Sequence, residues 1–349
     1  MNVPVDVERM MAFLVDLLEI PSPTGDTAEA IEFVRREFSH LPVPFNVTSK
    51  GFLVGTWEGR HSNAPRALTA HVDTLGAMVR AIKDNGRLRL TQLGSWTWNS
   101  LEGEGVTVLT GNGQRFRGTI LPTVASGHAY TRTEGTAKRT EKNMEVRIDA
   151  RTTSEEETTE LGIRVGDVVA FDPRVEIGDA GFIRSRHLDD KAGVAAIYGA
   201  LTALANAGEQ PAQRTTVHIS NYEEVGHGAA AGFPDDLTEL LTVDMAVVAK
   251  EQTSDEFSVT ICAKDSAGPY HLGLRRRLES LAEENEIEYA VDVYPYYGSD
   301  GEAYWRAGGD VAVGLVGPGV DASHHYERTH RKALEETARL LVAYLLSQE

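Results

Sequence analysis

Two adjacent glutamates, Glu223 and Glu224, are the residues whose type and spacing point most clearly to chemistry. They follow the apolar run 215–220 and precede a glycine turn. Because adjacent carboxylates repel each other unless a positive charge lies between them, the pair predicts a bound cation. One glutamate could ligate a metal ion while its neighbour acts as a general base toward water. A solvated acidic turn is the competing interpretation in a chain this acidic.

His71 and Asp73 form a second candidate pair, directly after the apolar run 66–70. Alternate residues of a strand point to the same side, so both polar side chains share one face. His71 can bind a metal through one ring nitrogen while Asp73 accepts a hydrogen bond from the other. For a His-x-Asp pair taken alone, an ordinary structural histidine near a strand end is the better explanation.

Asp189 and Asp190 stand at the start of a predicted helix, followed by Lys191. A helix N-terminus favours one carboxylate there, both as a cap and through the helix dipole. Capping accounts for Asp190 and leaves Asp189 unexplained. A carboxylate that bridges two cations is the functional interpretation of Asp189.

Ligand-type side chains also follow two later apolar runs. Asp244 comes after 240–243, and the segment 323–330 after the run 311–316 contains three histidines. Spacing alone does not choose among His324, His325 and His330. Active sites of open α/β sheets lie at the carboxyl ends of strands, so five such segments together predict a two-metal hydrolytic site. With no cysteine among the ligands, we expect two divalent ions, zinc first and cobalt or manganese as alternatives.

The elements that position these residues alternate between helix and strand at both ends of the chain. Apolar periodicity predicts helices over 7–20, 27–38 (with Thr27 as cap), 192–207, 272–286 and 329–346, and strands over 51–57, 67–70, 216–220, 246–249, 290–294 and 311–316. Between 78 and 180, short alternating runs separated by turns predict a β-rich insert, with a mobile loop over 134–143 and a capped helix from 153 to 161. We therefore expect an α/β catalytic domain from 1–77 and 181–349, interrupted by an inserted domain over 78–180.

Composition excludes several classes of function. The net charge of −18 argues against nucleic acid or an anionic membrane as a partner. No apolar run approaches the length of a membrane span, and the first residues lack the features of a signal peptide. The single cysteine, Cys262, lies in a strand-like run and is interpreted as a buried structural thiol. A chain without disulfides fits a reducing compartment, so we expect a cytoplasmic protein.

In the same order along the chain, these segments resemble the glutamyl and deblocking aminopeptidases of metallopeptidase family 42, which include the tetrahedral aminopeptidases. The matching segments are 20–25, 71–73, 161–167, 187–193, 223–226, 243–244, 298–300 and 323–324. Segments 181–191, 320–324 and 326–330 are similar to a narrower subgroup, associated with bacterial synthesis of the osmolyte N-acetylglutaminylglutamine amide. Two positions depart from the family pattern: Thr74 stands where glutamate is usual, and His325-Tyr326-Glu327 replaces the usual residues after the last histidine.

The resemblance implies a fold, an activity and a role for each candidate residue. The fold would be a zinc-peptidase-like α/β/α sandwich with a mixed central sheet and a small β-barrel-like insert for dimer contacts or as a lid. The activity would be removal of terminal residues from small peptides by a homo-oligomer built from dimers, up to a dodecamer. One ion would be bound by His71 and Asp244 and the other by Glu224 and His324, with Asp189 bridging both, Glu223 as catalytic base, Asp73 orienting His71, and Asp190 supporting Asp189.

Two other functions remain open from the sequence. Related co-catalytic carboxypeptidases and deacylases use a similar set of ligands, and an N-acetylated dipeptide amide has no free amine for an aminopeptidase to bind. A non-catalytic assembly protein with an inherited fold is the third interpretation. The presence of every expected ligand type, and of Glu223, favours the hydrolase over that third interpretation.

Overall fold

The structure is a computed structural model, and it describes residues 3–348. The chain forms two compact units, one from the residues up to Asp73 together with those from Arg174 on, the other from Thr74–Pro173. The insert expected over 78–180 overlaps the second unit, whose two bounds lie a few residues earlier in the chain. A role of that unit in dimer contacts or as a lid remains a prediction.

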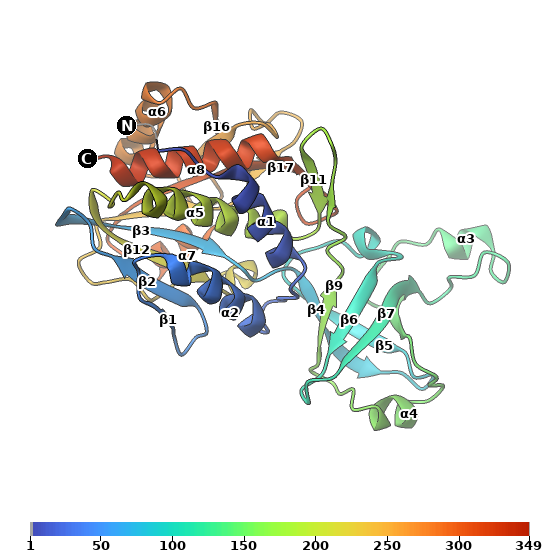
Figure 1. The fold of residues 1–349 in the computed structure, drawn as a ribbon. Coiled ribbons are helices and arrows are strands. Elements are labelled where there is room, and N and C mark those ends of the chain that lie inside the picture. Colours follow the sequence, from blue (N-terminus) through green and yellow to red (C-terminus); the bar gives the residue numbers. More distant parts are fainter. Residues whose placement is uncertain (1–2, 349) are drawn as a thin grey trace. The chain divides into compact units, whose positions relative to one another are not determined.

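The first unit is built on a mixed sheet of twelve strands (Figure 1). Its centre is the run β12-β3-β13-β17, in which neighbouring strands pair in parallel. Antiparallel strands flank this centre on both sides, β2 beside β12 and β18 beside β17. The predicted mixed central sheet is confirmed. The strands are β1 (Phe45–Val47), β2 (Leu53–Trp57), β3 (His61–His71), β10 (Glu176–Ile177), β11 (Phe182–Ser185), β12 (Gln213–Ser220), β13 (Glu239–Val243), β14 (Ala246–Val248), β15 (Val259–Lys264), β16 (Tyr289–Val293), β17 (Ala312–Asp321) and β18 (Glu327–His330).

Helices cover both faces of this sheet, because its central strands are apolar on both sides. Leu68 and Leu241 pack into one core, whereas their neighbours Ala67 and Leu240 pack into another. On the first face, α1 and α8 pack against the long helix α5, as Figure 1 shows; α7 packs against β3 and β13 in the second core. The α/β/α sandwich is therefore confirmed. The helices are α1 (Val7–Leu18), α2 (Ala28–Glu37), α5 (Leu188–Ala207), α6 (Leu272–Glu284), α7 (Asp300–Arg306) and α8 (Arg331–Leu346), with short 3-10 turns η1 (Phe38–His40) and η3 (Glu223–Val225).

Of three local predictions about helix starts, two need correction and one is confirmed. The last helix begins at Arg331 and not at residue 329, because Glu327–His330 pairs with β11 as strand β18. Thr27 precedes α2, but its side chain does not cap the helix; its hydroxyl accepts a hydrogen bond from Asn221 instead. Asp190 does act as the expected cap, since its Oδ1 accepts from the amide of Gly193 at 3.1 Å.

The second unit is a closed barrel of six antiparallel strands, in the order β4-β5-β8-β7-β6-β9 (Figure 1). Alternate apolar residues such as Val106, Val108 and Val146 form its core, which confirms the predicted barrel. The helix expected from residue 153 is α4, capped by Ser154, whereas the segment expected to be a loop from 134 begins inside the short helix α3. The elements are β4 (Gly76–Ile82), β5 (Leu88–Leu93), η2 (Trp98–Leu101), β6 (Gly105–Leu109), β7 (Arg115–Pro122), α3 (Arg132–Gly135), β8 (Met144–Ile148), α4 (Glu155–Glu160) and β9 (Val168–Phe171).

Cys262 lies in β15 and is buried as a free thiol, in agreement with its structural interpretation. Burial raises the pKa of this thiol, so it is a poor nucleophile. Between residues 3 and 348, none of the helices has both the length and the apolar composition needed to cross a bilayer.

Candidate metal centre

The carboxyl ends of the parallel strands bring the predicted ligands to one edge of the sheet. His71 is the last residue of β3, and Asp244 directly follows β13. Glu223 and Glu224 follow β12 in the turn η3, and His324 follows β17. Parallel strands end at the same edge, and this common direction is why segments far apart in the sequence meet.

Asp189 lies between the two imidazoles. Its Oδ1 is 3.3 Å from Nε2 of His71, and its Oδ2 is 3.4 Å from Nε2 of His324. Nε2 of His324 also lies 3.8 Å from Oε2 of Glu224, and Nε2 of His71 lies 3.7 Å from Oε2 of Glu223. Each oxygen of Asp189 thus faces one imidazole, which is the arrangement that a carboxylate bridging two ions needs.

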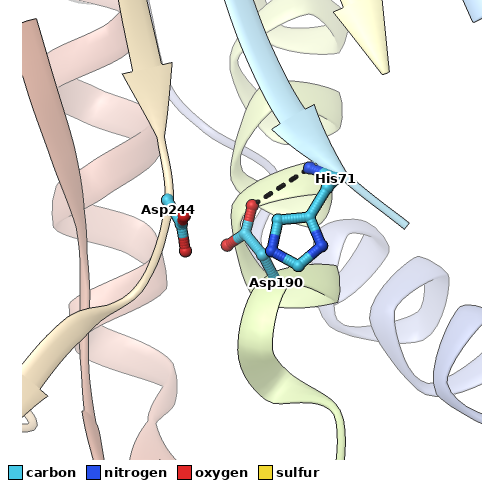
Figure 2. A group of neighbouring side chains, drawn as sticks. All are labelled: His71, Asp190 and Asp244. Atoms are coloured by element: carbon cyan, nitrogen blue, oxygen red, sulfur yellow. Dashed lines mark hydrogen bonds between the residues drawn. The ribbon is translucent and has the colours of Figure 1, made fainter. Parts of the chain in front are cut away.

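Within the described part of the chain, residues 3–348, two triads of side chains have ligand atoms within 4.8 Å of one another. One is Asp189, Glu224 and His324. The other is His71, Asp190 and Asp244, shown in Figure 2, where the three side chains come from β3, the start of α5 and the end of β13. Asp190 stands in this triad where the sequence suggested Asp189.

The hydrogen bonds of Asp190 distinguish its role from that of Asp189. Its Oδ2 accepts from the amide of His71 at 3.3 Å, the dashed line in Figure 2, and its Oδ1 accepts from Gly193. Both oxygens of Asp190 are therefore bonded to backbone amides, one of which belongs to the candidate ligand His71. A supporting role for Asp190, with Asp189 in the bridging position, remains a prediction.

Three buried polar atoms at the site fit a cation. Within residues 3–348, Nε2 of His71, Oε1 of Glu224 and Oδ1 of Asp244 are buried without a hydrogen-bond partner. A buried polar atom left in this state costs about 1–3 kcal/mol. All three atoms are ligand types that zinc accepts, and a divalent ion would satisfy them.

The electrostatics of the site point the same way. Burial, together with the charge of Asp189, raises the pKa of Asp244 to about 7. Burial and neighbouring carboxylates raise the pKa values of Glu223 and Glu224 well above the usual range. Asp189 differs, because contacts with His324 and His71 outweigh burial and lower its pKa. Buried carboxylates that lie this close together bind protons unless cations take the place of those protons. Cation binding at this site should therefore release protons.

Asp73 contacts the turn that carries the two glutamates. Its Oδ1 accepts from the amide of Glu223 at 3.1 Å, and its Oδ2 accepts from the amide of Glu224 at 3.3 Å and from the hydroxyl of Thr24 at 2.7 Å. Nδ1 of His71 is 2.9 Å from the carbonyl oxygen of Asp73 and 3.5 Å from its carboxylate. The sequence predicted that the Asp73 side chain contacts the ring of His71, but the carbonyl oxygen of Asp73 makes the closer contact. The carboxylate of Asp73 instead positions the η3 turn.

Only one of the three C-terminal histidines joins the site. His324 faces Asp189 and Glu224, as described above. The carbonyl oxygen of His325 accepts a hydrogen bond from Arg186, and the ring of His330 is 2.8 Å from the carbonyl oxygen of Ala180. The strand β18 begins between these histidines and carries His330 away from the ligands.

Three buried residues near the site were not assigned from the sequence. Glu327 accepts hydrogen bonds from the amides of Asp189 and His324. Asp300 accepts from the hydroxyl of Ser220 and from the amide of Ala229, on either side of the glutamate turn. Nζ of Lys191 donates to the carbonyl oxygens of Leu17 and Ile20, which fixes the segment before Thr24. The motifs 298–300 and 326–330 pointed to Asp300 and Glu327, but motifs do not reveal backbone contacts.

Similar proteins agree with this fold. YhfE of Bacillus subtilis (strain 168), provisionally named an aminopeptidase, is 46% identical over 341 residues, which is 98% of each chain. Among solved structures, the aminopeptidase APDkam598 from the archaeon Desulfurococcus kamchatkensis has a TM-score of 0.88 at 23% identity, covering 97% of this chain and 95% of that one. The TET1 peptidase of Pyrococcus horikoshii has a TM-score of 0.85 at 23% identity, over 97% and 99% of the two chains.

The mixed sheet with its inserted barrel is therefore the zinc-peptidase-like fold of these solved structures. Residues 51–340 match the model of the M42 glutamyl aminopeptidase family. The chain belongs to that family of peptidases.

Proposed function

We propose that this protein is a two-metal aminopeptidase that removes the N-terminal residue from short peptides. The observation that carries the proposal is the position of Asp189, whose two carboxylate oxygens each face one imidazole at 3.3 and 3.4 Å. The buried, unpaired ligand atoms around it support the same conclusion.

The proposed ligands divide into two sets that share Asp189. His71 and Asp244 would bind one ion, and Glu224 and His324 would bind the other. Zinc is the expected metal, with cobalt or manganese as substitutes. When bound, the two ions would polarise the scissile carbonyl group and lower the pKa of the attacking water.

Glu223 is the proposed base. Burial, outweighing the favourable charge of His71, raises its pKa well above the usual range, so this carboxylate has the basicity to take a proton. It would accept the proton of the attacking water on a carboxylate oxygen and deliver it to the amine that leaves. Asp73 would keep Glu223 and Glu224 in place through their backbone amides.

The finer parts of the proposal concern substrate and assembly. The segments that resemble the osmolyte-associated subgroup suggest a dipeptide of osmolyte metabolism as the natural substrate. The TET1 peptidase of Pyrococcus horikoshii assembles into a tetrahedron or an octahedral shell, which supports a homo-oligomer here. A cytoplasmic location is expected from the acidic, disulfide-free composition.

Release of para-nitroaniline from Leu, Glu and Lys para-nitroanilides tests the proposal, each assayed with a free and with an acetylated amine. We expect the free amines to be cleaved, a chelator to stop the reaction, and zinc, cobalt or manganese to restore it. A free amine appearing in the acetylated series, detected with an amine reagent, with no para-nitroaniline released from the free-amine series, would assign a deacylase. A protein that binds metal but cleaves neither series would favour the assembly role.

A further inference from the structure

Glu327 lies at the junction of two segments that carry proposed ligands. It is the first residue of β18 and is 1% exposed. The pairing of β18 with β11 sets Glu327 opposite Ser185, shortly before Asp189 in the chain. The pairing of β18 with β17 closes the turn that contains His324.

The carboxylate of Glu327 connects these two segments. Oε2 accepts a hydrogen bond from the amide of Asp189 at 3.2 Å, and Oε1 accepts from the amide of His324 at 3.0 Å. The two amides are far apart in the sequence, yet each bonds to a different oxygen of one side chain. One buried carboxyl group thus supplies an acceptor to both amides, and a side chain that replaces it must offer two acceptors at the same positions.

The backbone at His324 makes this contact more important. His324 has a φ of 65°, in the left-handed region that non-glycine residues rarely adopt. Such a conformation is strained for a residue with a Cβ atom and persists only where neighbouring contacts fix it. The hydrogen bond to Glu327 is one such contact, and it sets where the imidazole of His324 lies relative to Asp189.

We propose that Glu327 is a positioning residue, which fixes the spacing between Asp189 and His324 so that both can bind the same metal ion. The inference rests on the proposed two-metal function. Glu327 supports both ligands through their amides and is not itself a ligand. Because Glu327 bonds to the amide of His324, it should matter more for the ion bound by Glu224 and His324 than for the ion bound by His71 and Asp244.

Glu327→Gln tests this with little change in volume. The amide side chain has one acceptor oxygen, so only one of the two backbone amides keeps a partner and the other faces a donor. Loss of a supporting contact of this kind typically reduces metal affinity or activity 10- to 100-fold. We expect the affinity for one of the two cobalt ions to fall about 10- to 100-fold, and the affinity for the other ion to change by less than about threefold.

The measurement is a cobalt titration of the metal-free protein, followed by visible absorption and by calorimetry. Activity should return in Glu327→Gln as the cobalt concentration rises, because the chemistry of the site is intact. Glu327→Asp retains both carboxyl oxygens but is too short to reach both amides, so it should shift the same ion. It also keeps the test available if the glutamine variant does not fold.

Asp292→Asn is the matched control. Oδ2 of Asp292 also accepts from two backbone amides, those of Thr253 and Ser254, but Asp292 contacts none of the proposed ligands. The control should lower thermal stability without changing either cobalt affinity. Wild-type protein that binds no cobalt would refute the proposed function itself. Two-ion binding by the wild type, with unchanged or equally weakened affinities in both Glu327 variants, would overturn only the positioning role.

Discussion

Substitution of Asp73 by asparagine perturbs the turn that carries the proposed base without removing a proposed ligand. The carboxylate of Asp73 accepts three hydrogen bonds, from the amides of Glu223 and Glu224 and from the hydroxyl of Thr24. Asparagine keeps the size and shape of the side chain but replaces one acceptor oxygen with an NH2 donor. At least one of the two backbone amides must then face a donor.

The hydrogen-bond pattern indicates which contact is lost. If the NH2 group takes the position of Oδ2, the hydroxyl of Thr24 can rotate to accept from it, and only the amide of Glu224 loses its partner. One hydrogen bond to a charged group contributes about 1.5–3 kcal/mol, so we expect the free energy of unfolding to fall by that amount. Because the turn also places the base and a ligand, kcat/KM should fall about 10- to 100-fold.

The assay compares Asp73→Asn with wild type by urea unfolding and by hydrolysis of the most active para-nitroanilide. Asp292→Asn again serves as the control, since Asp292 also accepts from two consecutive amides and one hydroxyl, those of Thr253 and Ser254. The control should lose similar stability and retain activity. Full activity in Asp73→Asn, with the stability loss present, would refute the argument that Asp73 positions the glutamate turn.

Three further predictions follow from the site and its surroundings. Glu223→Gln should retain both metal ions but lose about 10²- to 10⁴-fold in kcat, the usual contribution of a general base; a variant as active as wild type would remove Glu223 from that role. Dialysis against a chelator should abolish hydrolysis, and the loss of the ions should lower the melting temperature. Activity unchanged by chelation would exclude metal-dependent chemistry. Burial, with a contact to Asp265, raises the pKa of Glu302 to about 7 from an unfolded value near 4.5, so the folded state binds more protons between these values. The stability that Glu302 contributes is present below pH 4.5 and is lost as the pH rises to about 7, by at most about 1.4 kcal/mol per pH unit. Urea unfolding of wild type and of Glu302→Gln across this range should show a difference in free energy of unfolding with this slope. A difference that does not change with pH would contradict the prediction.

The positions of the proposed ligands could be predicted because each follows an apolar run. His71 is the last residue of a strand, and Asp244 and Glu224 follow two others; all three strands are buried on both faces, and such strands have a clear sequence pattern. Parallel strands end at a common edge, so knowing that the runs are strands was nearly enough to predict that these side chains meet.

The choice among the three histidines was not available from the sequence. The strand that separates His324 from His330, β18, is only four residues long and polar, without the apolar alternation that marks a strand. Its residues were therefore assigned in part to the following helix. Only pairing with β11, a contact between distant segments, defines it.

The roles of Asp73 and Glu327 were also beyond sequence reasoning, for a related reason. Both side chains bond to backbone amides of other segments, and a backbone amide carries no residue type that a motif could reveal. Their carboxylates could be noticed, but their partners depend on the turn conformations that the fold imposes.

Anomalous diffraction from zinc-loaded crystals tests the central claim most directly. We expect two zinc peaks, one within about 2.0–2.2 Å of atoms of His71, Asp189 and Asp244, and one at similar distances from Asp189, Glu224 and His324. A single ion, or ions bound by other side chains with Asp189 bridging nothing, would contradict it.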